Sequence, residues 1–236
     1  MPYLSSLASQ YGLATNYYAN THPSIGNYFM LTTGQILTNN DSDCGVYSTD
    51  NLVRHLITAG KTWKAYAEGV PSAGYIGCDT GAYVKRHNPL SYFSDVVNSS
   101  SEKANLVPFT QFSTDLANNQ LPQFSFIAPD VNNDGHNGSL GQADSWLKTN
   151  IAPLIASPAF QNDGLLIILF DEAETNDSQG GGGHVAAVVI GPKVKRGYTS
   201  TTRYQHQSTL KTVLEALGAD TVLGAAANAP DMKEFF

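Results

Sequence analysis

The hydrophobic positions of this chain alternate along the sequence between helical spacing and short strand-like runs. Two of these runs, GLLIILF at residues 164–170 and HVAAVVI at residues 184–190, are almost continuously apolar, which is typical of parallel strands covered on both faces. Other strands are predicted at residues 13–19, 61–68 and 123–128, and helices at residues 3–11, 27–31, 51–59, 142–154 and 208–217. Because strands and helices alternate, we expect an α/β fold with a mostly parallel central sheet sandwiched by helices.

The length of 236 residues, of which 42% are hydrophobic, fits one large α/β domain, so we expect a single domain over residues 1–236. Residues 69–105 are rich in loops but contain three aromatic side chains that need burial, namely Tyr83, Tyr92 and Phe93. We interpret this stretch as an insertion over a site rather than as a linker.

Charge and cysteine content narrow the class of protein. The chain has a formal net charge of −7, which argues against the basic surface that nucleic-acid binding requires. No apolar run reaches the roughly 18 residues of a membrane span, and no signal peptide is recognised. Cys44 and Cys78 form no CxxC motif, which excludes a cysteine zinc site. They either form a disulfide, as exported proteins do, or remain two thiols.

Ligands of open α/β sheets bind beyond the carboxyl ends of strands, so the residues that follow each strand are candidates for chemistry. Asp171 and Glu172 directly follow the run at residues 164–170. Adjacent carboxylates repel each other unless a cation or hydrogen bonds compensate, and a divalent metal is the economical explanation. The alternative is that one carboxylate caps a helix while the other is solvated.

Ser24 lies where the first predicted strand leads into a helix, so its hydroxyl is expected beside helix amides that favour an anion such as phosphate. The alternative is a simple helix cap. Asp134 and His136 follow the strand at residues 123–128 and either supply ligands or form turns. Taken alone, the loop residues His87 and His206 do not distinguish a site from a structural role.

Four motifs in this order, THPSIGNY, RHNPLSYF, FIAPDVNNDGH and LLIILFDEAE, resemble the bacterial phosphoesterase family of acid phosphatases and phospholipases C. That family belongs to the alkaline phosphatase-like superfamily, and the resemblance covers nearly the whole chain. It implies a role for each matching position: Ser24 as nucleophile, Asn27 on a phosphate oxygen, His87 and His136 lining the phosphate site, Asp171 and Glu172 as the acidic metal pair with Ser24, and, more weakly, His206 as a further metal ligand, with Asp134 an additional candidate.

The resemblance implies metal-dependent hydrolysis of phosphate esters through a phosphoserine intermediate, in a protein that is exported. The expected cofactor is a divalent cation (Ca²⁺, Mg²⁺, Mn²⁺ or Zn²⁺), and the expected partner is a small phosphate ester or a phospholipid head group. Phospholipase C action on phosphodiester lipids is the alternative activity.

Members of the family begin with an apolar strand that ends in Glu-Asn and completes the metal site, and Met1 falls where that strand should already have ended. We therefore expect unpaired strand edges in the middle of the sheet and a metal with too few protein ligands. A non-catalytic phosphate-binding remnant is the corresponding alternative from outside the enzymes.

Overall fold

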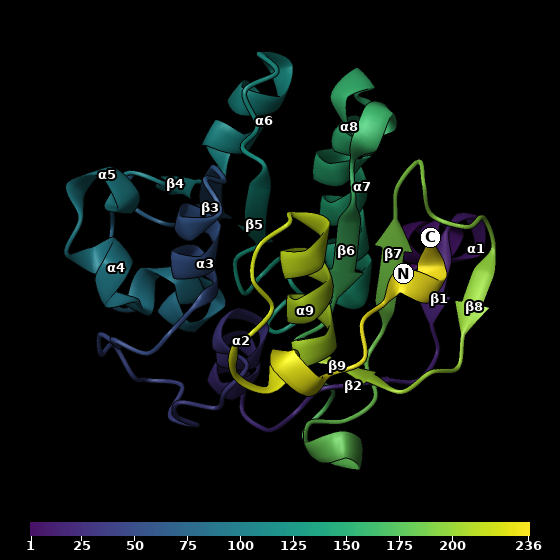
Figure 1. The fold of residues 1–236 in the computed structure, drawn as a ribbon, viewed down its shortest axis with the longest axis horizontal. Helices are drawn as coiled ribbons and strands as arrows, with labels where there is room; N and C mark the ends of the chain where they lie inside the picture. Colours follow the sequence, from purple (N-terminus) through teal and green to yellow (C-terminus); the bar gives the residue numbers. More distant parts are fainter.

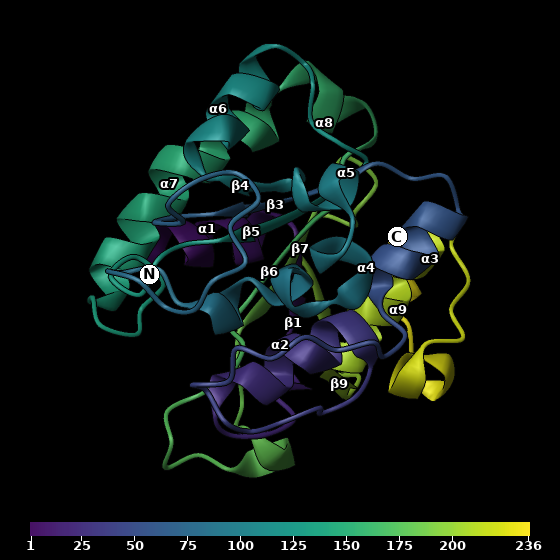
Figure 2. The same cartoon turned by 90° about the vertical axis from the view of Figure 1, so that its left-hand side faces the viewer.

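The computed structural model describes all residues from 1 to 236. Its strands form two larger sheets and one two-stranded sheet (Figure 1). Seen from the side, the strands lie between two groups of helices: α1 and α7 are on one side, and α2 and α9 are on the other (Figure 2). The predicted α/β fold with a sheet between helices is therefore confirmed.

The first sheet has the strand order β6-β7-β1-β8. Its strands are β1 (Gly12–Ala14), β6 (Leu166–Leu169), β7 (Ala187–Ile190) and β8 (Tyr198–Ser200). The prediction that β7 is a parallel strand is wrong, because β7 runs antiparallel to both β6 and β1. All four residues of β7 are buried, and this two-sided burial gives an antiparallel strand the apolar run that is usual for a parallel one.

The second sheet has the order β4-β3-β5, and its strands are all parallel. They are β3 (Trp63–Ala67), β4 (Leu106–Pro108) and β5 (Phe124–Ala128). A short parallel pair joins β2 (Tyr17–Tyr18) to β9 (Tyr204–Gln205). The single strand predicted at residues 13–19 is thus divided between β1 and β2, which belong to different sheets.

The main helices cover the two sheet faces with separate apolar cores. Their bounds are α1 (Pro2–Gln10), α2 (Ser24–Thr33), α3 (Leu52–Thr58), α7 (Leu140–Ala156) and α9 (His206–Ala216); the shorter ones are α4 (Ser94–Val97), α5 (Ser100–Lys103), α6 (Thr110–Ala117) and α8 (Pro158–Asp163). Leu4, Leu7 and Ile151 pack with β7 on one face, whereas Phe29 and Leu210 pack on the other. No helix combines the length and the apolar composition that crossing a membrane requires.

Helix α2 begins at Ser24, three residues earlier than the predicted start at residue 27. Ser24 is therefore the first helical residue rather than part of the preceding loop. Pro23 occupies the cap position in an extended conformation and has no side chain that could bond the first amides. The Ile25 amide of the first turn donates instead to Asp41 Oδ1 at 3.0 Å, and the amino end of α2 lies at the end of the sheet where Ser24 lies.

The facing edges of the two sheets are unpaired. β5 is hydrogen-bonded only to β3, and β6 is hydrogen-bonded only to β7. A cavity of about 1910 Å³ runs along both edges and is lined by half-buried apolar side chains of the two strands. The unpaired edges expected from the sequence therefore lie between β5 and β6, and one end of the cavity reaches Ser24.

The stretch at residues 69–105 contains α4, α5 and two short 3-10 helices, and its three aromatic side chains are buried as expected. Cys44 and Cys78 form a disulfide, which decides between the two alternatives that the sequence left open. Lys85 is buried beside this bridge and donates hydrogen bonds to the carbonyl oxygens of Cys44 and Ile76, at 3.1 and 3.0 Å. The stretch is thus fastened to the chain before it.

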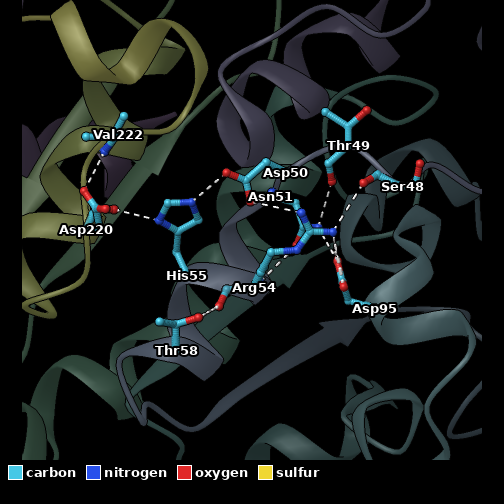
Figure 3. Close-up of polar contacts among 10 residues, drawn as sticks. All are labelled: Ser48, Thr49, Asp50, Asn51, Arg54, His55, Thr58, Asp95, Asp220 and Val222. Atoms are coloured by element: carbon cyan, nitrogen blue, oxygen red, sulfur yellow. Dashed lines mark hydrogen bonds and ion pairs between the residues drawn. The ribbon is translucent and has the colours of Figure 1, made fainter.

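A polar network on α3 makes a second attachment for this stretch (Figure 3). Arg54 Nη2 lies 3.0 Å from Asp95 Oδ2 on α4, and Asn51, which caps α3, donates to the same oxygen at 2.7 Å. His55 lies between the Asp50 carboxylate and the carbonyl oxygen of Asp220, at 3.0 and 2.9 Å. Helix α3 therefore links the inserted stretch to the segment that follows α9.

Near the end of the chain, the Glu234 carboxylate joins β8 and β9. It accepts hydrogen bonds from the hydroxyl groups of Tyr198, Ser200 and Tyr204, with the Tyr198 contact at 2.9 Å. Partial burial opposes ionisation of Glu234, but the hydroxyl groups of Ser200, Tyr204 and Tyr198 outweigh it and lower the pKa of Glu234 to about 2. Ionised Glu234 is therefore favoured in the folded chain.

The first prediction concerns acid stability. Glu234→Gln should lower the free energy of unfolding at pH 7 by about 1 kcal/mol, because three hydrogen bonds lose a charged acceptor. The pKa is lower in the folded chain than in the unfolded one, so the contribution is complete above the usual glutamate pKa and is lost as pH falls toward 2. Urea unfolding between pH 7 and pH 3 should show the gap between wild type and variant closing. A gap that is constant with pH would contradict this, and exposed Glu174→Gln is the control.

Candidate active site

Polar residues that follow β5 and β6, or that begin α2, lie at the same end of the cavity. Asp171 and Glu172 follow β6, Asp134 follows β5, and Ser24 begins α2. The cavity is lined there by Ser24, His87, Asp134, His136, Asp171 and Glu172. This is the arrangement expected where strands of an α/β sheet end.

Ser24 and Glu172 are in direct contact. Ser24 is only 3% exposed, and its Oγ donates a hydrogen bond to Glu172 Oε1 at 2.6 Å. A hydroxyl that donates to a carboxylate at this distance makes a strong, charge-assisted hydrogen bond. The oxygen of Ser24 is thus oriented at the amino end of α2, where the helix dipole favours negative charge.

His22 contacts the other oxygen of Glu172. Its Nδ1 meets Glu172 Oε2, and its Nε2 lies 2.9 Å from the carbonyl oxygen of Asp177. Burial lowers the pKa of His22, but the Asp177 carbonyl and the Glu172 carboxylate raise it by more, so the net shift is upward. Both oxygens of Glu172 are therefore engaged by residues of the same short segment.

Asp171 has a different environment from its neighbour. Its Oδ2 is buried without a hydrogen-bond partner. Burial raises the pKa of Asp171, and nearby His87 and Ser24 oppose that rise only in part. A buried carboxylate oxygen with no donor is costly, which makes this atom the clearest sign that a cation or a polar ligand belongs at the site.

His206, expected as a weak candidate for a metal ligand, is fully buried and has both ring nitrogens engaged. Its Nε2 lies 2.6 Å from the carbonyl oxygen of Asp171, and its Nδ1 lies 3.1 Å from the Tyr17 hydroxyl. Burial lowers the pKa of His206 to about 4, so the ring is neutral. In this arrangement the ring holds the Asp171 backbone and presents no free nitrogen to an ion.

His87 and Asp134 form a second pair beside the acidic residues. His87 Nδ1 lies 3.1 Å from Asp134 Oδ2, but the two groups are not aligned for a hydrogen bond. The His87 ring is 5% exposed and stacks on Tyr28 with centroids 5.0 Å apart. Its Nε2 is buried without a partner. The structure thus places His87 at the site with an unpaired ring nitrogen.

Asn27 and His136 are placed differently. Asn27, expected on a phosphate oxygen, is fully buried and does not line the cavity. Its Oδ1 accepts from the amides of Asn20 and Thr21, and its Nδ2 donates to the Thr21 carbonyl, because those backbone groups lie within 2.8–3.1 Å. His136 is exposed on the cavity rim, and its Nδ1 lies 2.9 Å from Asn137 Oδ1. Asn27 therefore braces the loop before Ser24.

The donors fit a hard cation in their chemistry, although they are few. No group of three or more His, Cys, Asp or Glu side chains is arranged to hold a metal ion. Asp171, Glu172 and Ser24 offer only oxygen atoms, which suit Ca²⁺, Mg²⁺ or Mn²⁺ better than Zn²⁺. The unpartnered Asp171 Oδ2 is the atom that such an ion would satisfy.

The glycine run at residues 180–183 packs against the loop that leads to Ser24. A Cβ atom on Gly181 would lie 2.1 Å from the Asn20 carbonyl oxygen, and one on Gly182 would lie 2.2 Å from that of Thr21. Backbone hydrogen bonds join Ala19 to Gly182 and Gly183. The glycines therefore allow two backbones to approach closely.

Sequence reasoning assigned no role to Glu68 or His22. Glu68 follows β3, and its Oε2 accepts from the Asp130 amide and from Asn133 Nδ2, each at 3.0 Å. It thereby fixes the loop that carries Asp134. The signal was present, because Glu68 is an acidic residue at the carboxyl end of a predicted strand, much as Asp171 directly follows one.

Comparison with known proteins identifies relatives over most of the chain. The sequence model of the phosphoesterase family matches residues 1–218. A probable acid phosphatase of Kluyveromyces lactis is 36% identical over 222 residues, which cover 89% of this chain and 52% of that protein. A phosphatidylinositol-3-phosphatase of Mycobacterium tuberculosis is 32% identical over 237 residues, which cover 100% of this chain and 75% of that protein. The chain thus spans about half the length of the yeast relative.

Among solved structures, a protein in the alkaline phosphatase superfamily from Vibrio parahaemolyticus is similar with a TM-score of 0.63 at 13% identity. The match covers 99% of this chain and 65% of that one. At this level of identity the similarity shows the fold alone, and it agrees with the sheet and helix layers described above.

The second prediction tests the close approach of the two backbones. Gly182→Ala should push the loop before Ser24 away from the acidic pair, because its Cβ would overlap the Thr21 carbonyl. We expect a loss of about 1–3 kcal/mol in the free energy of unfolding. Gly141→Ala is the matched control, since its Cβ would meet nothing closer than 3.7 Å within α7, and it should be neutral or stabilising. Equal unfolding midpoints for the two variants would show that the glycine is not required.

Proposed function

The chain belongs to the phosphoesterase family, as its four motifs predict, and we propose that it hydrolyses phosphate monoesters with Ser24 as the nucleophile. The observation that carries this proposal is the hydrogen bond from Ser24 Oγ to Glu172 Oε1 at 2.6 Å, at the end of a large cavity. A serine at the start of a helix and beside an acidic pair has both an acceptor for its proton and amides for an anion.

The chemistry proceeds in two displacements. Ser24 Oγ attacks phosphorus in line while its proton passes to the Glu172 carboxylate, and the bond from phosphorus to the leaving oxygen breaks. The leaving alkoxide takes a proton from water and departs as the alcohol. A water molecule then attacks the phosphorus of the phosphoserine, and the bond from phosphorus to Ser24 Oγ breaks. Oγ takes back the proton held by Glu172, which restores the Ser24 hydroxyl, and the inorganic phosphate released neutralises the hydroxide left by the first step.

Charge on the phosphoryl oxygens needs donors that are already oriented. The proposed donors are the unpaired ring nitrogen of His87 and the amides at the start of α2 other than that of Ile25, which donates to Asp41 Oδ1. His136 is exposed and lines the same cavity, and we propose it as a further donor. Asn27 contributes indirectly, because it holds the backbone turn at residues 20–21 that precedes the nucleophile.

A divalent cation bound by Asp171, Glu172 and the Ser24 oxygen would lower the pKa of the serine hydroxyl and offset the charge of the phosphoryl group. These three residues would offer oxygen atoms to the cation, and Asp171 Oδ2 has no hydrogen-bond partner in the chain. We propose an exported protein, because the Cys44–Cys78 disulfide is stable in oxidising compartments.

The substrate class follows from the relatives. The yeast relative is named a probable acid phosphatase and the mycobacterial one a phosphatidylinositol-3-phosphatase. Both names describe hydrolysis of a phosphate monoester. We therefore propose monoesters, either soluble or on a phospholipid head group, as substrates. Phospholipase C activity and a non-catalytic phosphate-binding remnant are the alternatives that the assays below distinguish.

The third prediction is that Ser24→Ala abolishes hydrolysis of p-nitrophenyl phosphate, with a loss of at least roughly 10³-fold, because no side chain can replace the nucleophile. The free energy of unfolding should change by only about 1 kcal/mol, the value of one hydrogen bond. Ser145→Ala is the control, since that hydroxyl contacts only the Gly141 carbonyl. Turnover by the Ser24→Ala variant at the wild-type rate would exclude Ser24 as nucleophile.

The fourth prediction concerns the cation. Treatment with a chelator should remove activity, and Ca²⁺, Mg²⁺, Mn²⁺ or Zn²⁺ added singly should restore it in at least one case. The same assays with p-nitrophenyl phosphorylcholine, a phosphodiester, should show lower rates than with the monoester. Activity that resists the chelator would contradict metal dependence, a preference for the diester would favour phospholipase C, and phosphate binding without turnover would favour the remnant.

A further inference from the structure

The imidazole of His22 lies between Glu172 and the loop that follows it. Its Nδ1 contacts Glu172 Oε2, and its Nε2 lies 2.9 Å from the Asp177 carbonyl oxygen. A carboxylate and a peptide carbonyl only accept hydrogen bonds, so a ring nitrogen that carries a proton donates to the group that it faces. The His22 and Glu172 side chains are 20% and 18% exposed, so water competes little for these contacts.

The Asp177 carbonyl is a fixed point in its loop. The Asp177 carboxylate accepts hydrogen bonds from the amides of Gln179 and His184, each at 3.0 Å. The backbone amide of Ala173 donates to Gly182 at 2.9 Å, which closes the same loop from the other end. His22 therefore connects Glu172 to backbone that is held independently.

Glu172 has three rotatable bonds before its carboxylate, so its contact with Ser24 alone leaves its orientation free to vary. The contact with His22 Nδ1 fixes the second oxygen. Because His22 and Ser24 are two residues apart, the carboxylate is held on both oxygens by one short segment. Its position relative to the nucleophile is therefore set by the pair of contacts.

We propose that His22 is a positioning residue, which orients the Glu172 carboxylate toward Ser24 and ties it to the backbone at Asp177. The proposal rests on the proposed function of Ser24 and Glu172. His22 itself does not touch the substrate, and it acts through Glu172. Groups that orient acidic site residues in this way commonly affect activity or metal affinity by roughly 10–100-fold.

Three substitutions separate the two contacts of the ring. In His22→Asn the side-chain amide nitrogen lies near the former Nδ1 and can still donate to Glu172. In His22→Gln it lies near the former Nε2 and can still donate to the Asp177 carbonyl. His22→Phe keeps a ring but makes neither contact.

With p-nitrophenyl phosphate, kcat should fall roughly 10–100-fold in His22→Phe and His22→Gln, while KM changes by less than about threefold, because substrate binding groups are untouched. His22→Asn should recover most of the lost kcat. Wild-type kcat in His22→Gln together with low kcat in His22→Asn would overturn the proposal, because the ring would then serve only to tie the loop. Unchanged kcat in all three variants would overturn it as well.

A second measurement does not depend on activity. Urea unfolding midpoints of His22→Phe, Glu172→Gln and the double variant should be non-additive, since each single change removes the same contact. The control cycle pairs His22→Phe with Glu174→Gln, an exposed carboxylate, and should be additive. Additivity in both cycles would overturn the proposal. Coupling between His22 and Glu172 in a chain that hydrolyses no phosphomonoester would support the positioning contact and overturn the proposed function instead.

Discussion

The hydrogen bond between Ser24 and Glu172 joins two segments that are 148 residues apart in the sequence. Every other feature of the site depends on this approach. Helix α2 must begin at Ser24 for the hydroxyl to face the acidic pair, and β6 must end at the same level for Glu172 to reach it. His22 and the Asp177 backbone hold the carboxylate in that position. A pair of short elements therefore decides the chemistry that the cavity can perform.

Backbone contacts, rather than side chains, bring these segments close enough. Gly181 and Gly182 lie against the carbonyl groups of Asn20 and Thr21, at distances that no side chain would permit. Asn27 bonds the amides of that same turn, so one loop is braced from both sides. The amide of a buried asparagine and a run of glycines thus perform one structural task, which is to keep Ser24 beside the acidic pair.

The cavity between β5 and β6 separates the site into two halves. His87 and Asp134 belong to the half formed by the β3 sheet and the inserted stretch, whereas Asp171 and Glu172 belong to the half formed by β6 and β7. The disulfide between Cys44 and Cys78, the buried Lys85 and the Arg54 network fasten the inserted stretch. The two halves meet at Tyr28 and Ser24 of α2, so this helix is the common support of the site.

The sequence by itself determined the residue types and their local elements. Apolar periodicity is a local property, so it predicted α1, α3, β3, β5, α7 and α9 within a few residues, and it placed Asp171 and Glu172 directly after a strand. The motifs identified the family for the same reason, since they are short and contiguous. Only the tertiary structure decided that β7 runs antiparallel, because burial on both faces gives the same apolar pattern in either direction. It also decided the contacts of His22, Asn27 and the glycine run. Each contact joins atoms that only the folded chain, through a loop turn or a distant segment, brings together.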